Sequence, residues 1–269
     1  MTPFSVTKGD SAIVLGIPHG GIWLPDGLTA RLNPNGRALA DTDWHIARLY
    51  DGLLQGVTVV ASNVHRYAID ANRDPAGVSL YPGQNTTSLC PVTDFDGAPI
   101  WAEGQEPSED EILARRVAFH APYHAALQAE IDRVKARHGV AILYDCHSIR
   151  SLIPFLFAGT LPVFSIGTND GTSCAALVQC STADPCQKAE GFDTVINGRF
   201  KGGWTTRHYG RPQDGIHAIQ MELAQRAYLA DEAAPWAYDH AKADALRPVL
   251  GRVLGDLDLL ARSGRLAHG

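Results

Sequence analysis

Short apolar runs alternate along this 269-residue chain with longer segments of helical period. The runs are rich in Val, Ile and Leu and are bounded by Gly, Pro, Asp or Ser, a pattern typical of buried strands. They fall at residues 12–18, 57–62, 67–71, 140–146, 161–166 and 215–223. Strands that alternate with helices predict a three-layer α/β fold, in which a mixed, at least partly parallel β-sheet has helices on both faces.

Three segments predict helices around this sheet. One begins near Asp41. A longer one begins at Ser108, with Glu111 as its capping-box partner and an apolar stripe that starts with Leu113 and Val117. The third, at about 235–261, would cover the sheet. Residues 75–107 are rich in Gly, Pro, Thr and Asp, and a loop of this length in a compact domain is usually a lid or a binding loop. We expect one domain over residues 1–269.

Composition excludes several classes of function. The net charge of −6 leaves no basic surface suited to nucleic acid. No apolar run is long enough to span a membrane, and the first residues do not resemble a secretion signal. Five cysteines form an odd set without a Cys-x-x-Cys pair, which favours a reducing cytoplasm. We therefore expect a cytoplasmic monomer or small homo-oligomer whose partner is a small acidic molecule.

Two of the apolar runs end in a histidine. His19 ends the first run and is followed by two glycines, and His147 follows the run at 140–146. Strands that end at one edge of a sheet deliver side chains to the place where α/β proteins bind ligands. Two imidazoles and a carboxylate at that edge would form a three-ligand zinc site with one position open to water. The structural alternatives are a turn histidine at position 19 and a packed core histidine at position 147.

The residues before His147 support the metal hypothesis. A strand has a period of two, so Asp145 shares a face with His147 while Cys146 points to the opposite face. A metal-bound imidazole usually donates its second N–H to a carboxylate, and Asp145 is a candidate for that acceptor. Cys146 is expected to be a packed thiol.

The segment Asp41-Thr-Asp43 offers a third metal ligand. Both aspartates fall at the start of a predicted helix, where helix capping is the structural explanation. The first helical turn after a strand lies on the same rim as the strand ends. We expect one aspartate to be a cap and leave the other as a candidate ligand.

Arg66 and Arg73 lie at the two ends of a short predicted strand, with Asn72 beside the second arginine. A guanidinium binds a carboxylate in a planar, two-point fork that lysine cannot reproduce. The pattern favours anion recognition over a solvated surface strand. Glu222 lies deep in the run at 215–223, where a carboxylate is costly without a partner. It is either a general base or the partner of Arg226 in a salt bridge.

The order of these motifs resembles one family closely, the N-formylglutamate amidohydrolases. The resemblance covers residues 13–228, and its most specific part is the segment 197–210. The motifs are Pro-His-Gly-Gly, Asp-Thr-Asp-Trp-His, Arg-Tyr-Ala-Ile-Asp-Ala-Asn-Arg, Leu-Tyr-Pro-Gly-Gln, Asp-Cys-His-Ser-Ile-Arg-Ser, Asn-Gly-Arg-Phe-Lys-Gly-Gly-Trp-Thr-Thr-Arg-His-Tyr-Gly and Gln-Met-Glu-Leu. The segment 66–73 is also similar to a signature of aspartoacylases and, more distantly, of zinc carboxypeptidases, with Ala71 in place of its leucine.

The resemblance implies a zinc-exopeptidase-like fold with one bound Zn²⁺. It also implies hydrolysis of N-formyl-L-glutamate to formate and L-glutamate, at the end of one route of histidine degradation. His19 and His147 would be zinc ligands. Carboxypeptidases have their carboxylate ligand three residues after the first histidine, a position held here by Ile22. The resemblance instead implies Asp43 as the third ligand, with Asp41 in reserve.

The resemblance also implies roles around the zinc. Glu222 matches the general base, and Arg66 matches the arginine that polarises the substrate carbonyl. Asn72 and Arg73 match the pair that binds the substrate carboxylate. The substrate has two carboxylates, so a further arginine is needed.

We expect Arg73 to bind the α-carboxylate and Arg207 to bind the side-chain carboxylate, with Arg150 behind it. The first alternative is a metal-dependent deacylase of another N-acyl amino acid, because spacing does not distinguish a formyl pocket from an acetyl pocket. A second is a cysteine hydrolase that uses Cys174 at a helix N-terminus, and a third is a non-catalytic zinc- or amino-acid-binding protein.

Overall fold

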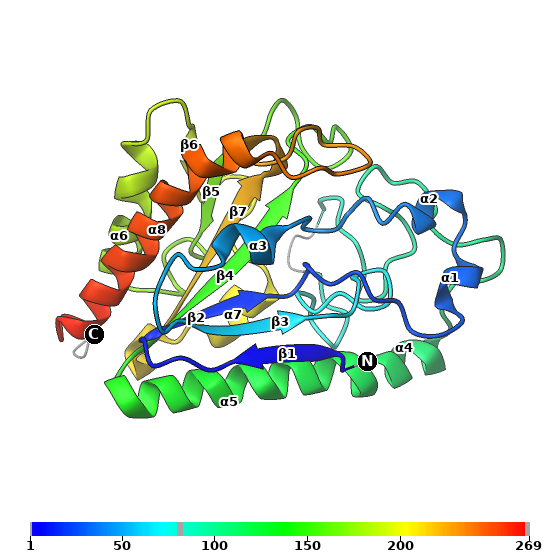
Figure 1. The fold of residues 1–269 in the computed structure, drawn as a ribbon. Helices are drawn as coiled ribbons and strands as arrows, with labels where there is room; N and C mark the ends of the chain where they lie inside the picture. The colour runs from blue at the N-terminus through cyan, green and yellow to red at the C-terminus, as the bar shows by residue number, and fades with distance from the viewer. Residues whose placement is uncertain (1, 80–82, 267–269) are drawn as a thin grey trace.

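A seven-stranded mixed sheet forms the centre of the molecule in a computed structural model, which describes residues 2–79 and 83–266 (Figure 1). The strand order is β1-β3-β2-β4-β7-β5-β6. The strands are β1 (Phe4–Thr7), β2 (Ile13–Ile17), β3 (Thr58–Ser62), β4 (Ala141–Ile149), β5 (Phe164–Gly167), β6 (Thr194–Ile196) and β7 (Ile216–Ala224).

The four central strands, β3, β2, β4 and β7, are parallel to one another. The edge strand β1 is antiparallel to β3. On the other side β5 is antiparallel to β7, and β6 is parallel to β5. The predicted mixed sheet is therefore confirmed, and the C-terminal ends of its parallel strands meet at one edge, where α/β proteins place their ligands.

Five of the six predicted strands form, and the one at residues 67–71 is wrong. Tyr67 and Ala68 lie in a turn and Ile69 lies in irregular backbone, and all three are buried in a separate apolar cluster with Leu32 and Trp101. A short apolar run indicates that a segment is buried, but it does not distinguish a strand from a packed loop, because both bury apolar side chains.

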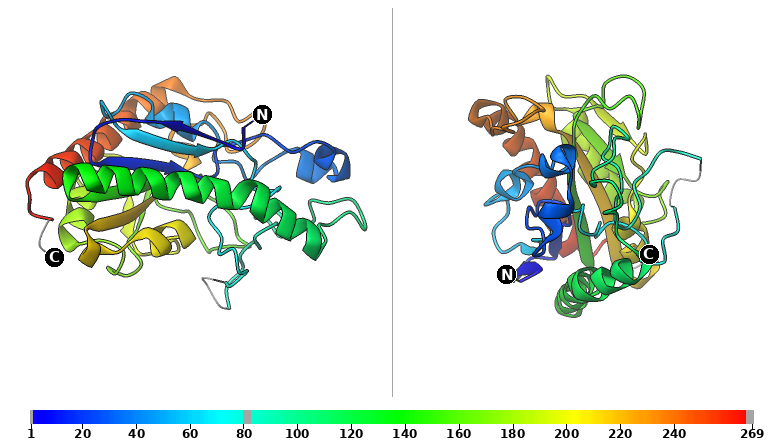
Figure 2. Two further views of the ribbon diagram at one scale, coloured as in Figure 1. Left: turned by 90° about the horizontal axis from the view of Figure 1, so that it is seen from below. Right: turned by 90° about the vertical axis from the view of Figure 1, so that its right-hand side faces the viewer.

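Helices cover both faces of the sheet (Figures 1 and 2). One face packs on α3 (Ile46–Tyr50), α6 (Ala176–Gln187) and α8 (His240–Arg262), and the other on α5 (Ala121–His138) and α7 (Trp204–Tyr209). The alternation of β4 shows this division, since Tyr144 and Cys146 join the first apolar core and Ala141 and Leu143 join the second. The predicted opposite orientation of Cys146 is confirmed.

The long helical segment that begins after Ser108 is interrupted by a π-helical turn. It consists of α4 (Glu109–Arg115), η1 (Arg116–His120) and α5. The Ser108 cap is confirmed, since its hydroxyl accepts the Glu111 N–H at 3.3 Å, but the Glu111 carboxylate binds Arg31. Leu113 and Val117 are exposed, contrary to the predicted stripe. A π-helical turn adds a residue to the helical repeat, which takes these two side chains out of the face that α5 buries.

Long loops lie beyond the C-terminal ends of β2 and β3, together with α1 (Leu28–Arg31) and α2 (Pro34–Arg37) (Figure 1). The predicted loop at 75–107 has no helix or strand of its own among its described residues, and part of its Leu-Tyr-Pro-Gly-Gln motif, residues 80–82, lies outside them. The short helices η2 (Pro212–Asp214) and η3 (Gln225–Ala227) flank β7. Within residues 2–79 and 83–266, no helix combines the length and apolarity that crossing a membrane requires.

Candidate metal centre and active site

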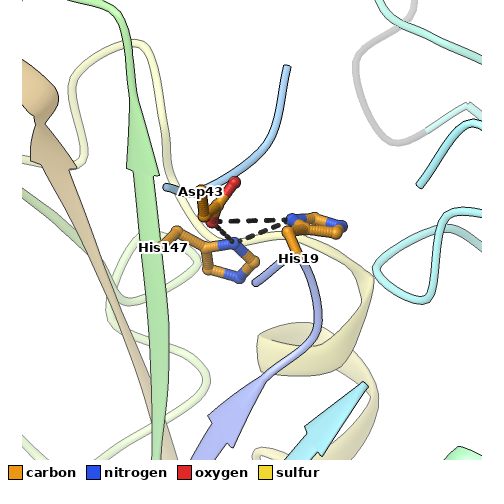
Figure 3. A group of neighbouring side chains, drawn as sticks. All are labelled: His19, Asp43 and His147. Atoms are coloured by element: carbon orange, nitrogen blue, oxygen red, sulfur yellow. Dashed lines mark hydrogen bonds and ion pairs between the residues drawn. The ribbon is translucent and has the colours of Figure 1, made fainter. Parts of the chain in front are cut away.

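Three predicted metal ligands from distant parts of the chain meet at the C-terminal edge of the parallel strands (Figure 3). His19 follows β2, His147 lies near the end of β4, and Asp43 precedes α3. The two Nδ1 atoms of the histidines are 3.1 Å apart, and Asp43 Oδ2 lies 3.8 Å from that of His19 and 3.4 Å from that of His147. All three side chains are buried. The structure thus brings His19, Asp43 and His147 together as one possible metal-binding group.

Each imidazole has a carboxylate on its other nitrogen. Asp70 Oδ1 lies 2.6 Å from Nε2 of His19, and Asp145 Oδ2 lies 3.1 Å from Nε2 of His147. An imidazole that donates its Nε2–H to a carboxylate presents the lone pair of Nδ1, the arrangement usual for metal-bound histidine. The expected partnership of Asp145 and His147 is therefore present, and Asp70 supplies a second one that sequence reasoning did not assign.

The chemistry of this donor set fits a divalent zinc-type cation. Two imidazole nitrogens and one carboxylate oxygen face one another, and three such protein ligands are usual in catalytic zinc sites. Burial and the nearby Arg66 lower the pKa of His19 to about 4, so this imidazole is neutral as a ligand requires. Burial acts to raise the pKa of Asp43, but the charge of Arg66 and the hydrogen bond with His147 outweigh it and hold the pKa below its usual value.

Asp41, the predicted alternative to Asp43 as third ligand, is not part of this metal-binding group. Its Oδ2 accepts the backbone N–H of Phe95 at 2.9 Å, which ties the 91–101 loop to the body of the protein. Burial raises the pKa of Asp41 to about 7. The expectation that one of these aspartates caps a helix is wrong, because α3 begins three residues after Asp43 and its N-cap is His45.

Glu222 lies beside His147 because of the register between β4 and β7. The two residues are direct partners in this parallel pair, as are Asp145 and Gln220, so all four side chains project from the same face of the sheet. Gln220 accepts the Gly203 N–H and donates to Glu222 Oε2 at 3.1 Å. Burial raises the pKa of Glu222 to about 8. A carboxylate with a pKa near neutrality is suited to general acid–base chemistry.

The salt bridge considered for Glu222 does not form. Arg226 instead donates to the carbonyl oxygen of Leu161 at 2.9 Å and to Asp193 at 3.2 Å. The side chain of Glu222 faces a cavity of about 70 Å³. The residues that line this cavity come from the sheet edge and from four loops; they are His19, Arg66, Asn72, Arg73, Asn85, Thr86, Thr87, Phe95, His147, Ser148, Ile149, Leu156, Arg199, Phe200, Gly203, Gln220 and Glu222.

Arg66 is the buried cation of the cavity. Its Nη2 donates to Asp43 Oδ1 at 3.1 Å, and its guanidinium lies 4.9 Å from the centre of the Phe95 ring. Only 5% of the residue is exposed. These contacts fix a positive charge next to the proposed metal ligands, where negative charge on a carbonyl oxygen would be stabilised.

Asn72 and Arg73, for which carboxylate binding is predicted, also line the cavity. Asn72 Oδ1 accepts the Thr205 N–H at 2.8 Å, and Asn72 Nδ2 lies 3.1 Å from His147 Nε2. Arg73 donates to the carbonyl oxygen and to the hydroxyl of Thr87, each at 2.9 Å. The pair is therefore held by the loop at 85–87 on one side and by the start of α7 on the other.

The two arginines expected to bind a second carboxylate do not line this cavity. Arg207 is on α7 and donates to the carbonyl oxygen of Gly202, and Arg150 forms an ion pair with Asp96 at 2.8 Å. The cavity instead contains Arg199, which sequence reasoning did not single out. The sequence feature that could have identified Arg199 is its position in the segment 197–210, the most specific part of the family resemblance.

Cys174 lacks the surroundings of a nucleophilic thiol. It is 3% exposed, and burial raises its pKa to about 12, so the thiolate is scarce at neutral pH. It does not line the cavity. All five cysteines are free thiols. These facts disfavour the cysteine-hydrolase alternative.

The mixed sheet, the buried Glu222 and the arginines that line the cavity define an α/β protein with an arginine-rich site at the edge of its parallel strands. The model of the N-formylglutamate amidohydrolase family matches residues 11–229, and the chain belongs to this family. It is 44% identical over 254 residues to the N-formylglutamate deformylase of Pseudomonas aeruginosa, covering 94% of this chain and 95% of that protein. It is 42% identical over 251 residues to the N-formylglutamate deformylase of Pseudomonas putida, covering 93% of each.

Solved structures share the fold at lower sequence identity. The N-formylglutamate amidohydrolase from Ralstonia eutropha JMP134 superposes with a TM-score of 0.79 at 23% identity, over 98% of this chain and 100% of that one. The gene product Atu2144 from Agrobacterium tumefaciens gives a TM-score of 0.72 at 18% identity, over 96% and 95% of the two chains. At these sequence identities the two structures support the fold alone. The chemistry is argued from the residues of the site.

Proposed function

We propose that this protein hydrolyses N-formyl-L-glutamate to formate and L-glutamate with the help of one bound zinc ion. Two relatives more than 40% identical over most of their length are named N-formylglutamate deformylases, and family membership supports the same activity here. The observation that carries the proposal is the register of β4 and β7, which sets Glu222 beside His147 in one cationic cavity. We further propose that the reaction ends a cytoplasmic route of histidine degradation, a compartment compatible with five free cysteines.

His19, Asp43 and His147 would hold the zinc ion. When bound there, the ion would supply Lewis-acid polarisation and a water of lowered pKa. Asp70 and Asp145 keep the two imidazoles oriented through their Nε2 atoms. The arrangement also argues against a mere zinc store, because neither Glu222 nor Arg66 is needed to bind a cation.

Glu222 would act first as base and then as acid. One of its carboxylate oxygens takes a proton from the water that attacks the formyl carbon, forming the new C–O bond. The same proton is then delivered to the amide nitrogen as the C–N bond breaks, which releases L-glutamate as the amine and formate as the acid. Gln220 orients the carboxylate for both transfers through its hydrogen bond to Oε2.

Arg66 would stabilise the negative charge that develops on the formyl oxygen. Its guanidinium is fixed by Asp43 and Phe95 before the substrate arrives, so little reorganisation is needed in the transition state. Arg73, with Asn72 beside it, would bind the α-carboxylate of the substrate through charge-assisted hydrogen bonds.

Formate release from N-formyl-L-glutamate tests the proposal. The purified protein should release formate, lose the activity with a chelator, and regain it when zinc is added back. Glu222→Gln should still bind zinc and lose turnover by about 10²- to 10⁴-fold. The same substitution at the exposed Glu190 is the matched control and should leave the rate unchanged. Chelator-resistant turnover, or a Glu222→Gln variant of normal rate, would refute this mechanism.

The alternative of another N-acyl amino acid is tested in the same assay. We expect kcat/KM to be higher for N-formyl- than for N-acetyl-L-glutamate, because the cavity that Glu222 and Arg66 line is small, about 70 Å³. A preference for the acetyl compound would make the protein a deacylase of a different substrate. The ligands and the base would keep their roles in either case.

A further inference from the structure

Two histidines hold the chain on both sides of Asn72. The Nε2 of His124 donates to the carbonyl oxygen of Ala71 at 2.7 Å, and the Nε2 of His120 donates to that of Arg73 at 3.1 Å. Both histidines are buried. The chain around Asn72 runs through a turn and a bend and belongs to no helix or strand. The two imidazoles therefore supply the hydrogen bonds that regular secondary structure would otherwise give to these carbonyl groups.

The protonation state of the two rings follows from these contacts. A carbonyl oxygen only accepts hydrogen bonds, so the Nε2 of both rings carries a proton. Burial lowers the pKa of both imidazoles, that of His124 to about 3, so both rings are neutral at pH 7. The free Nδ1 of His124 accepts a hydrogen bond from the Tyr209 hydroxyl at 3.0 Å. His120 and His124 thus act on the chain as uncharged donors of fixed tautomer.

Helix packing fixes both imidazoles. His120 is the last residue of the π-helical turn η1, and His124 follows it by four residues in α5, so both side chains lie on one face of the helix. Their ring centres are 4.3 Å apart. Trp204, the first residue of α7, packs against both rings, with its centre 5.5 Å from that of His120 and 4.6 Å from that of His124. The donors therefore belong to two packed helices and not to the loops of the cavity.

The segment that these donors hold contributes to the cavity. Asn72 and Arg73 line it and are the pair proposed to bind the α-carboxylate of the substrate. The backbone N–H of Asn72 also donates to Asp70 Oδ1 at 2.8 Å, the oxygen that lies 2.6 Å from His19 Nε2. A shift of the segment would reach the groups that position the substrate, although the two histidines themselves do not line the cavity.

We propose that His120 and His124 are positioning residues for the binding of the substrate's α-carboxylate. By holding the carbonyl oxygens on both sides of Asn72, they fix the places of Asn72 and Arg73 in the cavity wall. This inference rests on the proposed function, because it takes N-formyl-L-glutamate as the substrate. Neither imidazole contacts the substrate or transfers a proton in this role.

The test compares N-formyl-L-glutamate with 4-formamidobutanoate, which has the same formyl group and side-chain carboxylate and lacks only the α-carboxylate. The ratio of the two kcat/KM values measures how well the α-carboxylate is bound. His120→Met and His124→Met remove the N–H donors and should each lower this ratio by about 10- to 100-fold, the range for one hydrogen bond to a charged group. Glutamine is as long as methionine and ends in an amide N–H, so His120→Gln and His124→Gln should restore most of the ratio.

Two further variants complete the design. His138→Met, at the opposite end of α5, is the matched control and should keep the parent's ratio. His124→Asn carries an amide that is one bond too short to reach Ala71. It should also lower the ratio, and it decides the question if His124→Met does not fold.

The possible results separate a positioning role from a structural one. A ratio that is lowered in the Met variants and restored in the Gln variants supports the inference. An equal loss of kcat/KM for both substrates would mark a purely structural role and overturn it, as would a ratio lowered equally by Met and Gln. If the parent protein hydrolyses neither compound, the proposed function fails and the inference fails with it. If the parent is active and the Met variants keep its ratio, the inference alone fails.

Discussion

Gly203 lies where the segment before α7 crosses over Asn72, and replacing it with alanine perturbs the site without touching a charged group. The added Cβ would lie 2.2 Å from Asn72 Nδ2 and 2.6 Å from Asn72 Oδ1. Carbon atoms make ordinary contacts at about 3.5–4.0 Å, so either the segment or the Asn72 side chain must move by about 1 Å. Asn72 is buried and its side chain is hydrogen-bonded to Thr205, so it cannot move without disturbing that contact.

The magnitude follows from the hydrogen bonds that this movement breaks. Asn72 Oδ1 accepts the buried Thr205 N–H at 2.8 Å, and Gly203 N–H donates to Gln220 at 2.7 Å. A buried polar group left without a partner costs about 1–3 kcal/mol. For a domain of this size, each kcal/mol lowers Tm by about 2–4 °C, so Gly203→Ala should lower Tm by about 2–12 °C. A misplacement of about 1 Å in groups that position the substrate should also lower kcat/KM by about 100-fold.

Thermal unfolding and formate release measure the two effects. Gly255→Ala is the matched control, because Gly255 lies inside α8 and its added Cβ would meet nothing within 4 Å. Alanine is favoured over glycine in a helix, so this control should gain about 0.5–1 kcal/mol and keep its activity. A Gly203→Ala variant with the parent's Tm and kcat/KM would refute the argument from close packing.

Three further predictions concern the ligand choice, the cysteine and the pH. Asp43→Asn should lower the zinc content of the purified protein, while Asp41→Asn should keep zinc and lower Tm, since Asp41 holds the Phe95 loop; equal zinc loss in both variants would contradict the assignment. Cys174→Ala should retain full formate release, because the thiol is buried and its pKa is raised to about 12; inactivity of a folded variant would argue otherwise. Burial lowers the pKa of His124 to about 3, so its protonation below about pH 6.5 favours unfolding, and at about pH 5 it should cost about 2 kcal/mol. Urea unfolding at about pH 7.5 and pH 5 should therefore show a smaller difference for His124→Gln than for the parent protein.

The parts of the fold that sequence reasoning predicted are those set by local patterns. The runs that became β2, β4 and β7 are long, apolar and bounded by turn residues, and Ser108 caps α4 as its position indicates. The strand expected at residues 67–71 failed because a buried loop and a buried strand share the same apolar composition. The sequence also did not predict that Val117 is exposed, because a π-helical turn has no marked sequence signal.

The candidate site likewise contains residues that local sequence patterns predict and residues that they do not. His19 and His147 were indicated by their place at strand ends, and the alternation of β4 indicated Asp145 as the partner of His147. The contact of Asp70 with His19 was not predictable, since it joins residues 51 positions apart through a loop whose path depends on tertiary packing. Arg199 was missed for a related reason, because only the folded loops show which arginines of a charged segment face the cavity.

The proposed general base and one proposed zinc ligand lie on paired strands, whereas the arginines of the cavity lie on loops. The register of β4 and β7 sets Glu222 beside His147, whereas Arg73 and Arg199 lie on irregular segments outside the sheet and donate hydrogen bonds to the loop at 85–87. Under the proposed roles, exchanging those segments would change the surroundings of Arg73 while His147 and Glu222 keep their positions on the sheet. The scaffold is accordingly a natural starting point for engineering new deacylases by loop exchange.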